Sequence, residues 1–475
     1  MLFNSVIFLI FFAIVVGVHY LPIGWKLKKI HLLLASYFFY AAWNPPFVLL
    51  LWISTCVDWF AARAMSRQKQ QAKRKLLLGL SLFANLGMLS WFKYGTLIME
   101  TFSGLVSHVG ITWTVPDFNI TLPVGISFYT FQTLSYTIDV YLKRSEPESS
   151  FLDFALFVTF FPQLVAGPIV RPNQLIPQFK TPKQANAQQF SWGIMLFVWG
   201  LFQKSVLADS VLGPVAGHAF GLAEEMYVMD AWIATLAFSG QIFFDFAGYS
   251  LCAIGIALCL GFSLPDNFKS PYAAIGFSDF WRRWHISLSE WLRDYLYIPL
   301  GGNRKGRRRT QINLMLTMLL GGLWHGAAWR FVAWGAIHGS YLLLERGVKT
   351  LWRRRQDNVG LSPLQQVLVA AFTFLAVSLT WVFFAAPNWE ACEITFRSLV
   401  GATSQPIAVM ENIQIIYILP TLVIMLLGHS YMRNRRLEAV VSNTPIWLLL
   451  LLFLVVLLSV ILTGGGESAF IYFQF

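Results

Sequence analysis

Two histidines lie where an imidazole could perform acid–base chemistry. His325 lies in the apolar run LLGGLWHGAAW (residues 319–329), with glycines on both sides. His285 lies in SDFWRRWHISLSEWLRDYLYIPLGG (278–302), which is rich in tryptophan and arginine. A neutral imidazole is an effective general base because its ordinary pKa lies near working pH. Both residues are therefore candidates for catalysis.

Each histidine also has a structural interpretation. An ionisable side chain inside a membrane span is costly, which slightly favours a function for His325. Alternatively, a neighbouring carbonyl satisfies this histidine and the glycines allow close helix packing. The apolar spacing over 278–302 predicts one amphipathic helix at a membrane interface, and for this helix alone an anchoring role of His285 is favoured.

A third polar position is QIFFDFAGYSLCAIG (241–255), where Asp245 and Tyr249 share one face of a predicted helix. An aspartate at such depth must be paired, protonated or in contact with water. From the residues alone, a tyrosine–aspartate hydrogen bond that joins two helices is favoured over a functional site. The polar groups of 122–141 and 160–172 fit a cavity wall and a packing seam equally well.

Several other chemistries are not indicated by the sequence. No histidine pair has metal-ligand spacing, and the chain lacks a phosphate-binding glycine loop and the nucleophile motif of serine hydrolases. We therefore expect no metal site and no bound cofactor. The four cysteines have no paired spacing, so no disulfide framework is predicted.

The elements that must position these side chains are predicted to be membrane-spanning helices. Hydrophobic residues fill 56% of the 475 positions and charged residues only 12%, whereas a soluble domain has about 25% charged residues. Apolar runs such as 4–18 and 444–464 are too long for barrel strands. We expect an all-α, polytopic membrane bundle of roughly eleven spans, with re-entrant and interfacial helices, that forms a single domain over 1–475.

Residues 1–20 are expected to remain as the first span, because they lack the basic start and the cleavage site of a signal peptide. Clusters of basic residues predict which loops face the cytoplasm. These clusters are 26–29, 67–75, 303–309, 352–355 and 433–436. The net charge of +12 is thus attributed to topology and not to nucleic-acid binding.

Two segments must enter the membrane and return to the same side. Residues 30–55 lie between cytoplasmic clusters and are interrupted by Pro45 and Pro46, which predicts a tight hairpin or a re-entrant pair. The chain between the 303–309 cluster and Arg346 must also turn, and the turn is predicted near His325. The loops near 100–118 and 387–408 should face outward and are short, so chemistry on that side would need a partner.

Six motifs resemble the membrane-bound O-acyltransferase family. They are LPVGISFYTFQTLSYTIDVY, FFPQLVAGPIVRP, FDFAGYS, LPDNFKSPY, DFWRRWHISLSEWLRDYLYIPLGGNR and NLMLTMLLGGLWHGAAWRFVAWGAIHG. The resemblance runs in order from about residue 5 to 350 and is looser beyond. It is strongest to the bacterial branch that forms the membrane subunit of alginate O-acetylation.

The resemblance implies a helical bundle with a central funnel open to both faces and the family histidine, here His325, at its bottleneck. The second family histidine corresponds to His285 on the cytoplasmic approach. Trp324, Asp245 and Tyr249 would line the substrate tunnel. The sequence departs from the family pattern at Leu251, where relatives often have aspartate, and this puts a role of that helix in doubt.

The implied activity is O-acyl transfer at the inner membrane of a bacterium. Acetyl-CoA, or another acyl thioester, would be the cytosolic co-substrate, with its phosphates near Arg282 and Arg283, although topology alone explains these charges. The acetyl group would reach an exported polysaccharide such as alginate through a periplasmic, hydrolase-like partner. Two alternatives are D-alanyl transfer to teichoic acid from a carrier-protein thioester, and a transporter or flippase of lipid-linked sugars.

Overall fold

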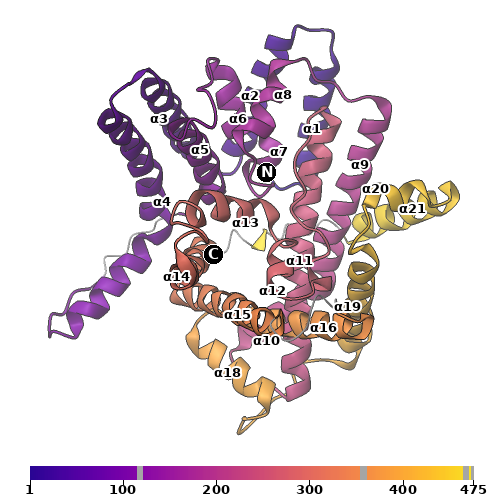
Figure 1. Cartoon of the computed structure of the whole chain (residues 1–475). Helices are drawn as coiled ribbons and strands as arrows, with labels where there is room; N and C mark the ends of the chain where they lie inside the picture. Colours follow the sequence, from indigo (N-terminus) through magenta and orange to yellow (C-terminus); the bar gives the residue numbers. More distant parts are fainter. Residues whose placement is uncertain (115–120, 354–360, 464–469, 472–475) are drawn as a thin grey trace.

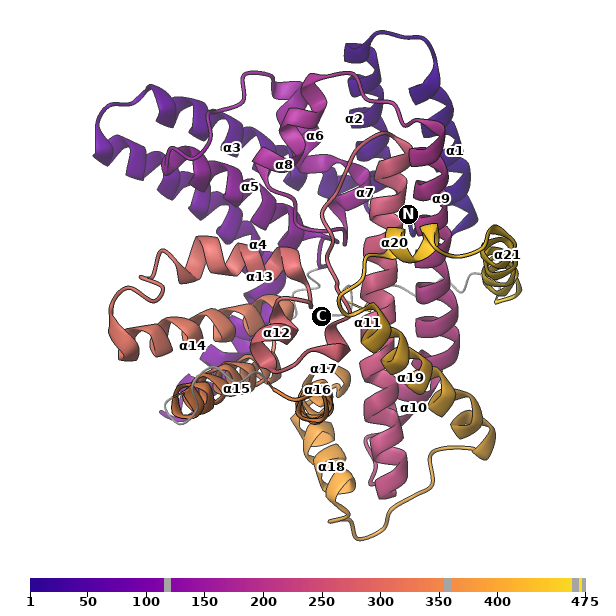
Figure 2. The ribbon, with the colours of Figure 1, turned by 45° about the vertical axis from the view of Figure 1, so that its right-hand side comes forward.

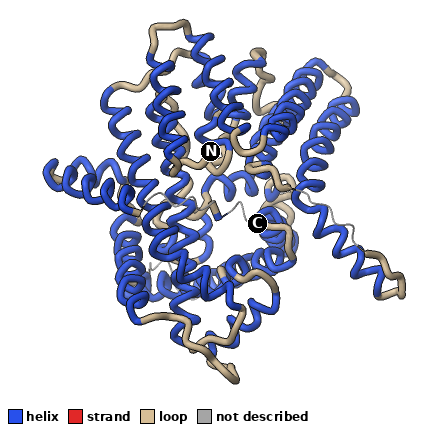
Figure 3. The backbone as a smooth tube through the Cα atoms, turned by 180° about the vertical axis from the view of Figure 1, so that it is seen from behind, coloured by secondary structure: helices blue, strands red, loops and turns tan. Residues whose placement is uncertain are grey.

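The structure, a computed structural model, describes residues 1–114, 121–353, 361–463 and 470–471. Within these ranges all regular structure is helical, apart from one isolated bridge between Met226 and Ile407 (Figures 1 and 3). The predicted all-α membrane bundle is therefore confirmed. The four cysteines are free thiols, as their spacing indicates.

The first third of the chain forms one side of the bundle. Its helices are α1 (Val6–Tyr20), α2 (Trp25–Ala41), η1 (Pro45–Phe47), α3 (Val48–Arg67), α4 (Gln71–Ser107), α5 (Ile126–Tyr141), α6 (Phe151–Thr159), α7 (Phe161–Leu164) and α8 (Pro172–Lys180). The two prolines begin the short turn η1 between α2 and α3, which confirms the predicted break of this segment.

Two long helical stretches run side by side along the right-hand side of the bundle in Figure 2. These segments are α9 (Ala187–Leu201), its π-helical continuation η2 (Phe202–Leu212), α10 (Gly213–Leu222) and α11 (Val228–Cys259). Helices α9 and α11 touch backbone to backbone, since a Cβ on Gly200 would lie 2.5 Å from the carbonyl oxygen of Gly248. Only small residues permit such an approach between membrane helices.

The segments that carry the two histidines lie near the centre of the molecule (Figure 1). They are η3 (Pro271–Ala273), α12 (Phe277–Trp281), α13 (Ile286–Leu292), η4 (Arg293–Tyr297), α14 (Gly306–His325) and α15 (Trp329–Arg353). The prediction of one continuous helix over 278–302 is wrong, because the chain breaks between α12 and α13. His285 lies at this break with a left-handed backbone, φ +42°.

The remaining helices complete the bundle. They are α16 (Pro363–Thr380), α17 (Val382–Ala385), α18 (Trp389–Val400), α19 (Asn412–Met432), α20 (Leu437–Ser442) and α21 (Ile446–Leu462). The predicted outward loop at 387–408 contains helix α18. Part of the other predicted loop is helical, because α4 extends to Ser107, and its residues 115–120 lie outside the described ranges, as do 354–355 of one basic cluster.

Six helices in the described ranges are long and apolar enough to cross a membrane, and two shorter apolar helices, Val6–Tyr20 and Ile446–Leu462, accompany them. The chain is therefore a multi-pass membrane protein. The predicted number of eleven crossings is not tested by these lengths, because α2 and α14 also pass through the bundle but are shorter or more polar. That number stays a prediction.

Candidate active site between two cavities

His325 is the last residue of α14. The helix ends there because the backbone of Gly326 is extended, and α15 begins at Trp329. The predicted turn near His325 is thus confirmed. The side chain of His325 is 3% exposed, and its ring packs edge-on against the rings of Trp324, Trp334 and Phe384 at centroid distances of 5.1, 5.1 and 5.4 Å.

The glycines around His325 serve mainly to pack helices. A Cβ on Gly322 would lie 2.2 Å from the carbonyl oxygen of Phe331 in α15, and a Cβ on Gly326 would lie 2.0 Å from the ring of the same phenylalanine. Gly321 differs, because it lines a cavity. The close-packing interpretation therefore holds for two of the three glycines.

His285 is fully buried and is oriented by Asn267. The side-chain oxygen of Asn267 accepts the backbone N–H of Ser287 (3.2 Å) and the Ser287 hydroxyl (2.9 Å), while the Asn267 amide nitrogen donates to Ser250. The backbone donor identifies this atom as the oxygen of the amide, so the Nδ1 of His285, 3.2 Å away, must be the donor.

The proton of a neutral His285 therefore lies on Nδ1, and Nε2 carries the lone pair. No side chain or backbone group in the described part of the chain bonds to Nε2. The rings of His285 and His325 have centroids 6.4 Å apart, and the ring of Trp324 lies 5.9 Å from that of His285. The fold thus brings together two histidines that are 40 positions apart in the sequence.

A cavity of about 860 Å³ reaches His325 from one side. Its wall is formed by α12, α13, α14 and α15, and includes Trp281, Ser289, Thr317 and Trp334. A volume in the range of about 300–1,000 Å³ is typical of small-molecule sites. Four cations line it, namely Arg282, Arg293, Arg346 and Lys349. The cavity is therefore suited to an anionic ligand.

The four cationic side chains differ in whether a carboxylate already pairs with them. Arg293 is bidentate to Asp294, and Lys349 pairs with Glu345. By contrast, no carboxylate in the described residues pairs with Arg282 or Arg346; Arg282 donates to the Ser278 carbonyl and Arg346 weakly to Asn303. Arg282 and Arg346 are thus the groups best able to bind added phosphate.

Arg283 does not line this cavity. Its guanidinium donates to Asp279 at 3.0 Å and to the backbone carbonyls of Lys269 and Arg433 at 3.1 and 2.8 Å. Arg433 binds the same aspartate at 2.9 Å. The structure therefore separates two adjacent arginines, one at the cavity and one within a network that ties α12 to the end of α19.

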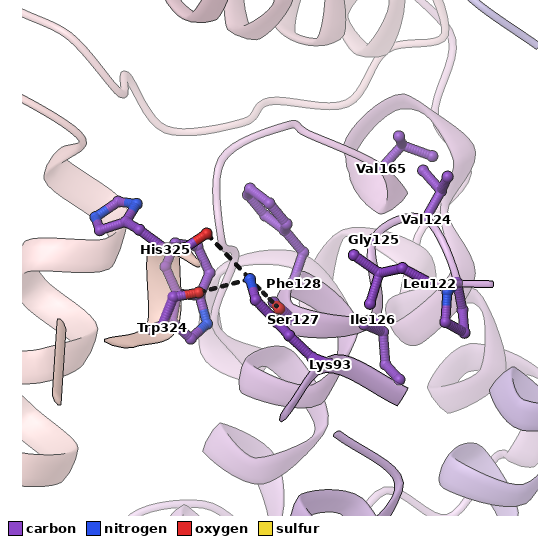
Figure 4. Close-up of a pocket in the computed structure, with 11 residues that line it drawn as sticks. Lys93, Leu122, Val124, Gly125, Ile126, Ser127, Phe128, Val165, Trp324 and His325 are labelled. Atoms are coloured by element: carbon purple, nitrogen blue, oxygen red, sulfur yellow. Dashed lines mark hydrogen bonds between the residues drawn. The ribbon is translucent and has the colours of Figure 1, made fainter. Parts of the chain in front are cut away.

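A second, smaller cavity of about 30 Å³ reaches His325 from another side (Figure 4). Lys93, Val124, Ser127, Phe128 and Trp324 are among its lining residues. Of the residues that line the two cavities, His325 alone is common to both. Trp324 lies in the wall of the smaller cavity, and its place beside a substrate tunnel stays a prediction.

Comparison with known proteins identifies the family. Residues 144–386 match the MBOAT, membrane-bound O-acyltransferase, family. The chain is 42% identical to the probable alginate O-acetylase AlgI of Pseudomonas putida over 397 residues, which cover 82% of this chain and 78% of that protein. The chain belongs to the membrane-bound O-acyltransferase family.

Other relatives act on different acceptors by name. The peptidoglycan O-acetyltransferase of Helicobacter pylori is 38% identical over 78% of this chain and 74% of its own length. The teichoic acid D-alanyltransferase of Streptococcus thermophilus is 28% identical over 55% of this chain and 68% of its own length. This member of the O-acyltransferase family is therefore an enzyme of membrane O-acylation, on its alginate O-acetylase branch.

Asp245 and Tyr249 line neither of the two cavities of this O-acyltransferase. Asp245 is buried and pairs with Lys204 of η2 at 2.6 Å, and its other oxygen accepts the backbone N–H of Ile471 at 2.9 Å. The expected hydrogen bond between Asp245 and Tyr249 is wrong: the Tyr249 hydroxyl has no partner among the described residues, and its ring stacks on Phe3. Their role in a tunnel stays a prediction.

Reasoning from the sequence missed three polar residues near these features. Lys93 lies in the middle of α4, Lys204 lies in η2, and Asn267 lies in the loop before η3. A lysine within an apolar helix is itself a signal of function, so Lys93 and Lys204 could have been found. Asn267 lies within the family motif LPDNFKSPY, but nothing in that motif indicates a contact with His285. The described residues contain no group of three or more potential metal ligands.

Proposed function

We propose that this O-acyltransferase takes an acetyl group from acetyl-CoA on the cytoplasmic side and passes it to a hydroxyl acceptor on the opposite side. The observation that carries the proposal is that His325 lines both cavities. An acyl donor in the larger cavity and an acceptor that arrives through the smaller one would meet at a single residue, His325. The acyl group would thus cross the membrane through the protein, while the rest of the donor stays on the cytoplasmic side.

The larger cavity suits the donor. Its opening is near Arg346 and Asn303, next to the basic cluster 303–309 that is predicted to be cytoplasmic. Arg282 and Arg346 supply positive charge for the phosphates of a nucleotide thioester. The buried residues Thr317, Gly321 and Trp334 of the cavity wall carry no charge, which fits the pantetheine arm and its acetyl thioester.

The acyl transfer needs one proton movement in each direction. His325 accepts the proton of the acceptor hydroxyl while the hydroxyl oxygen attacks the thioester carbonyl carbon. The tetrahedral intermediate then collapses, the carbon–sulfur bond breaks, and His325 returns the proton to the departing thiolate. Burial of His325 among aromatic rings excludes the water that would otherwise hydrolyse the thioester.

His285 would support this step from the second position. Because Asn267 holds the proton on Nδ1, the lone pair on Nε2 can accept a hydrogen bond from a group between the two rings. Trp324 contacts both imidazoles and would keep them apart at their separation of 6.4 Å. This arrangement favours His325 as the general base and His285 as a hydrogen-bond acceptor whose ring is held in place.

The final acceptor would be an exported polysaccharide. The names of the O-acetylating relatives, alginate and peptidoglycan, support this class of acceptor. The smaller cavity admits only a hydroxyl-sized group at His325, so a bulky glycan would receive the acetyl group through a partner on the outer side. We expect that partner to be a hydrolase-like periplasmic protein, and the membrane to be the bacterial inner membrane.

The proposal is tested with labelled acetyl-CoA and membranes that contain the chain. We expect acceptor-dependent loss of acetyl-CoA for the natural chain, loss of at least about 10²-fold of that rate for His325→Ala, and an unchanged rate for His218→Ala, which changes an exposed histidine. Melting of the purified variants in detergent checks that both remain folded. Full activity of folded His325→Ala contradicts the assignment.

The same assay separates the alternatives. A D-alanyl transferase would consume a D-alanyl carrier-protein thioester and leave acetyl-CoA intact. A transporter of lipid-linked sugars would consume neither thioester. The higher identity to the O-acetylating relatives, 42% against 28% for the D-alanyltransferase, favours acetyl transfer.

A further inference from the structure

The end of α14 is an unusual place for a helix to stop. Trp324 and His325 are 4% and 3% exposed, so water does not reach the helix end freely. The last carbonyl groups of any helix lack partners within the helix, and a buried carbonyl without a partner is costly. Gly326 is extended, so the chain does not fold back to cap them. The donors must therefore come from another element.

Helix α4 supplies these donors from two adjacent residues. The Tyr94 hydroxyl donates to the carbonyl of Leu323 at 2.9 Å. The Lys93 ammonium donates to the carbonyls of Trp324 and His325 at 2.8 and 3.1 Å. Three successive carbonyls at the end of α14 are thus bound by two side chains of α4. We call Lys93 and Tyr94 the α4 clamp.

Lys93 is suited to this place by its charge as well as its donors. The carboxyl end of a helix carries a partial negative charge of about half an elementary charge, which a nearby cation stabilises. No carboxylate in the described ranges pairs with Lys93; its third contact is the Ser127 hydroxyl at 3.5 Å. The helix end is therefore the main partner of this half-buried ammonium.

The clamp binds the backbone carbonyl of His325 and not its ring. In Figure 4 the carbonyl oxygens of Trp324 and His325 point toward Lys93, whereas the imidazole points away from it. Lys93 also lines the smaller cavity together with His325. A shift of α14 at this end would change the place of the imidazole relative to both cavities.

We propose that Lys93, with Tyr94, is a positioning residue that holds the buried end of α14 and thereby places His325 between donor and acceptor. This inference rests on the proposed function of His325. Because misplacement of a catalytic group by about 1 Å can cost about 10²-fold in rate, loss of the clamp should reduce turnover far more than donor binding. No residue of α4 lines the donor cavity, and the clamp holds only the last residues of α14, so the affinity for the donor should be kept.

The first experiment compares Lys93→Met, Lys93→Arg and a matched control, Lys73→Met, which removes an exposed lysine from the same helix. We expect kcat to fall about 10²-fold for Lys93→Met, with KM for acetyl-CoA within about twofold. Lys93→Arg keeps the charge and the hydrogen-bond donors, so its kcat should be at least about tenfold higher than that of Lys93→Met. Lys73→Met should match the natural chain.

A second measurement does not depend on acyl transfer. Diethyl pyrocarbonate modifies accessible imidazoles, and mass spectrometry reports the rate at each histidine. We expect Lys93→Met to change the rate of modification at His325 severalfold. The rate of modification at the exposed His108 should stay the same. If the natural chain fails to consume acetyl-CoA, the proposed function is wrong, and this measurement still tests the clamp.

Three results would overturn the inference. The first is a kcat of Lys93→Met equal to that of the natural chain. The second is an increase of KM alone, which would place Lys93 in donor binding. The third is a lowered melting temperature with no recovery by Lys93→Arg and an unchanged rate at His325, which would make Lys93 a purely structural residue.

Discussion

At the scale of single residues, neighbours in sequence have unlike roles because their side chains leave the backbone in different directions. Arg282 faces the large cavity, whereas Arg283 is held by Asp279 and two carbonyls. Asn267 is uncharged and lies in a loop, yet it determines which nitrogen of His285 carries the proton. The chemistry of the site therefore depends on contacts more than on residue type.

The donor can be identified by changing the two unpaired arginines. Replacement of Arg282 or Arg346 by alanine should raise KM for acetyl-CoA by roughly tenfold or more, because a hydrogen bond to a charged group contributes about 1.5–3 kcal/mol. KM for acetyl-pantetheine, which lacks the nucleotide, should not change. These constants are measured in membranes with saturating acceptor.

Arg283→Ala is the matched control for that measurement. It removes the same charge at the next position, but it breaks the network with Asp279 and Arg433, so we expect a lower melting temperature and an unchanged ratio of the two KM values. Equal effects of Arg282→Ala on acetyl-CoA and acetyl-pantetheine would contradict phosphate binding at Arg282.

At the scale of elements, the site depends on the hairpin of α14 and α15. The two helices approach so closely that a Cβ on Gly335 would lie 2.3 Å from the carbonyl of Met318, and one on Gly322 would lie 2.2 Å from that of Phe331. Close contact fixes the turn that carries His325. The glycines thus position the side chain of His325 through packing.

Gly322→Ala should destabilise the protein, because backbone atoms and not a flexible side chain oppose the new methyl group. We expect a cost of about 1–3 kcal/mol or more, visible as a lower Tm in detergent. Gly347→Ala is the control within α15, since nothing lies within 4 Å of its Cβ. It should raise stability by about 0.4–1 kcal/mol. A Tm unchanged by Gly322→Ala would show that the hairpin is looser than described.

A buried ion pair links other elements of the bundle. Lys204 binds Asp245 at 2.6 Å and Asp209 at 2.8 Å, and all three side chains are less than a tenth exposed. Lys204 and Asp209 lie in the π-helical segment η2, an irregular geometry that is frequent at functional positions. The pair of Lys204 and Asp245 joins η2 to α11. Ile471 donates its backbone N–H to Asp245, and Phe470 packs against Phe246 of α11.

At the scale of the whole molecule, the helices leave the two histidines near the middle of the bundle and the connecting turns at its ends. The turn between α1 and α2 and the loop between α18 and α19 lie at opposite ends in two views (Figures 1 and 2). The first of these turns adjoins the basic cluster 26–29. The charge pattern therefore predicts that the α18–α19 end faces outward.

This orientation can be checked by labelling cysteines in whole cells. In a chain whose four natural cysteines are replaced, Gln405→Cys should react with a membrane-impermeant maleimide. Pro22→Cys, exposed in the turn between α1 and α2, should react only after the cells are opened. Both outcomes follow from the position of the basic clusters. Reaction of Pro22→Cys in intact cells would reverse the predicted topology and the sides assigned to donor and acceptor.

Much of the architecture could be predicted from the sequence because its signals are local. Low charge and long apolar runs identify a helical membrane protein. Pro45 and Pro46 mark a break, and a glycine after His325 marks another, since these residues constrain the backbone wherever they occur. The motifs around His285 and His325 also identify the family. The break between α12 and α13 was missed because regular apolar spacing continues across it.

The partnerships of the polar side chains could not be predicted, because each depends on which helices approach one another. Asp245 binds Lys204 and not its neighbour on the same helix face, since η2 passes closer than the Tyr249 hydroxyl can reach. Lys93 lies 232 positions from His325 and binds its carbonyl. Composition and backbone-restricting residues thus specify the class of fold and its breaks, whereas long-range packing specifies which charges meet the two cavities.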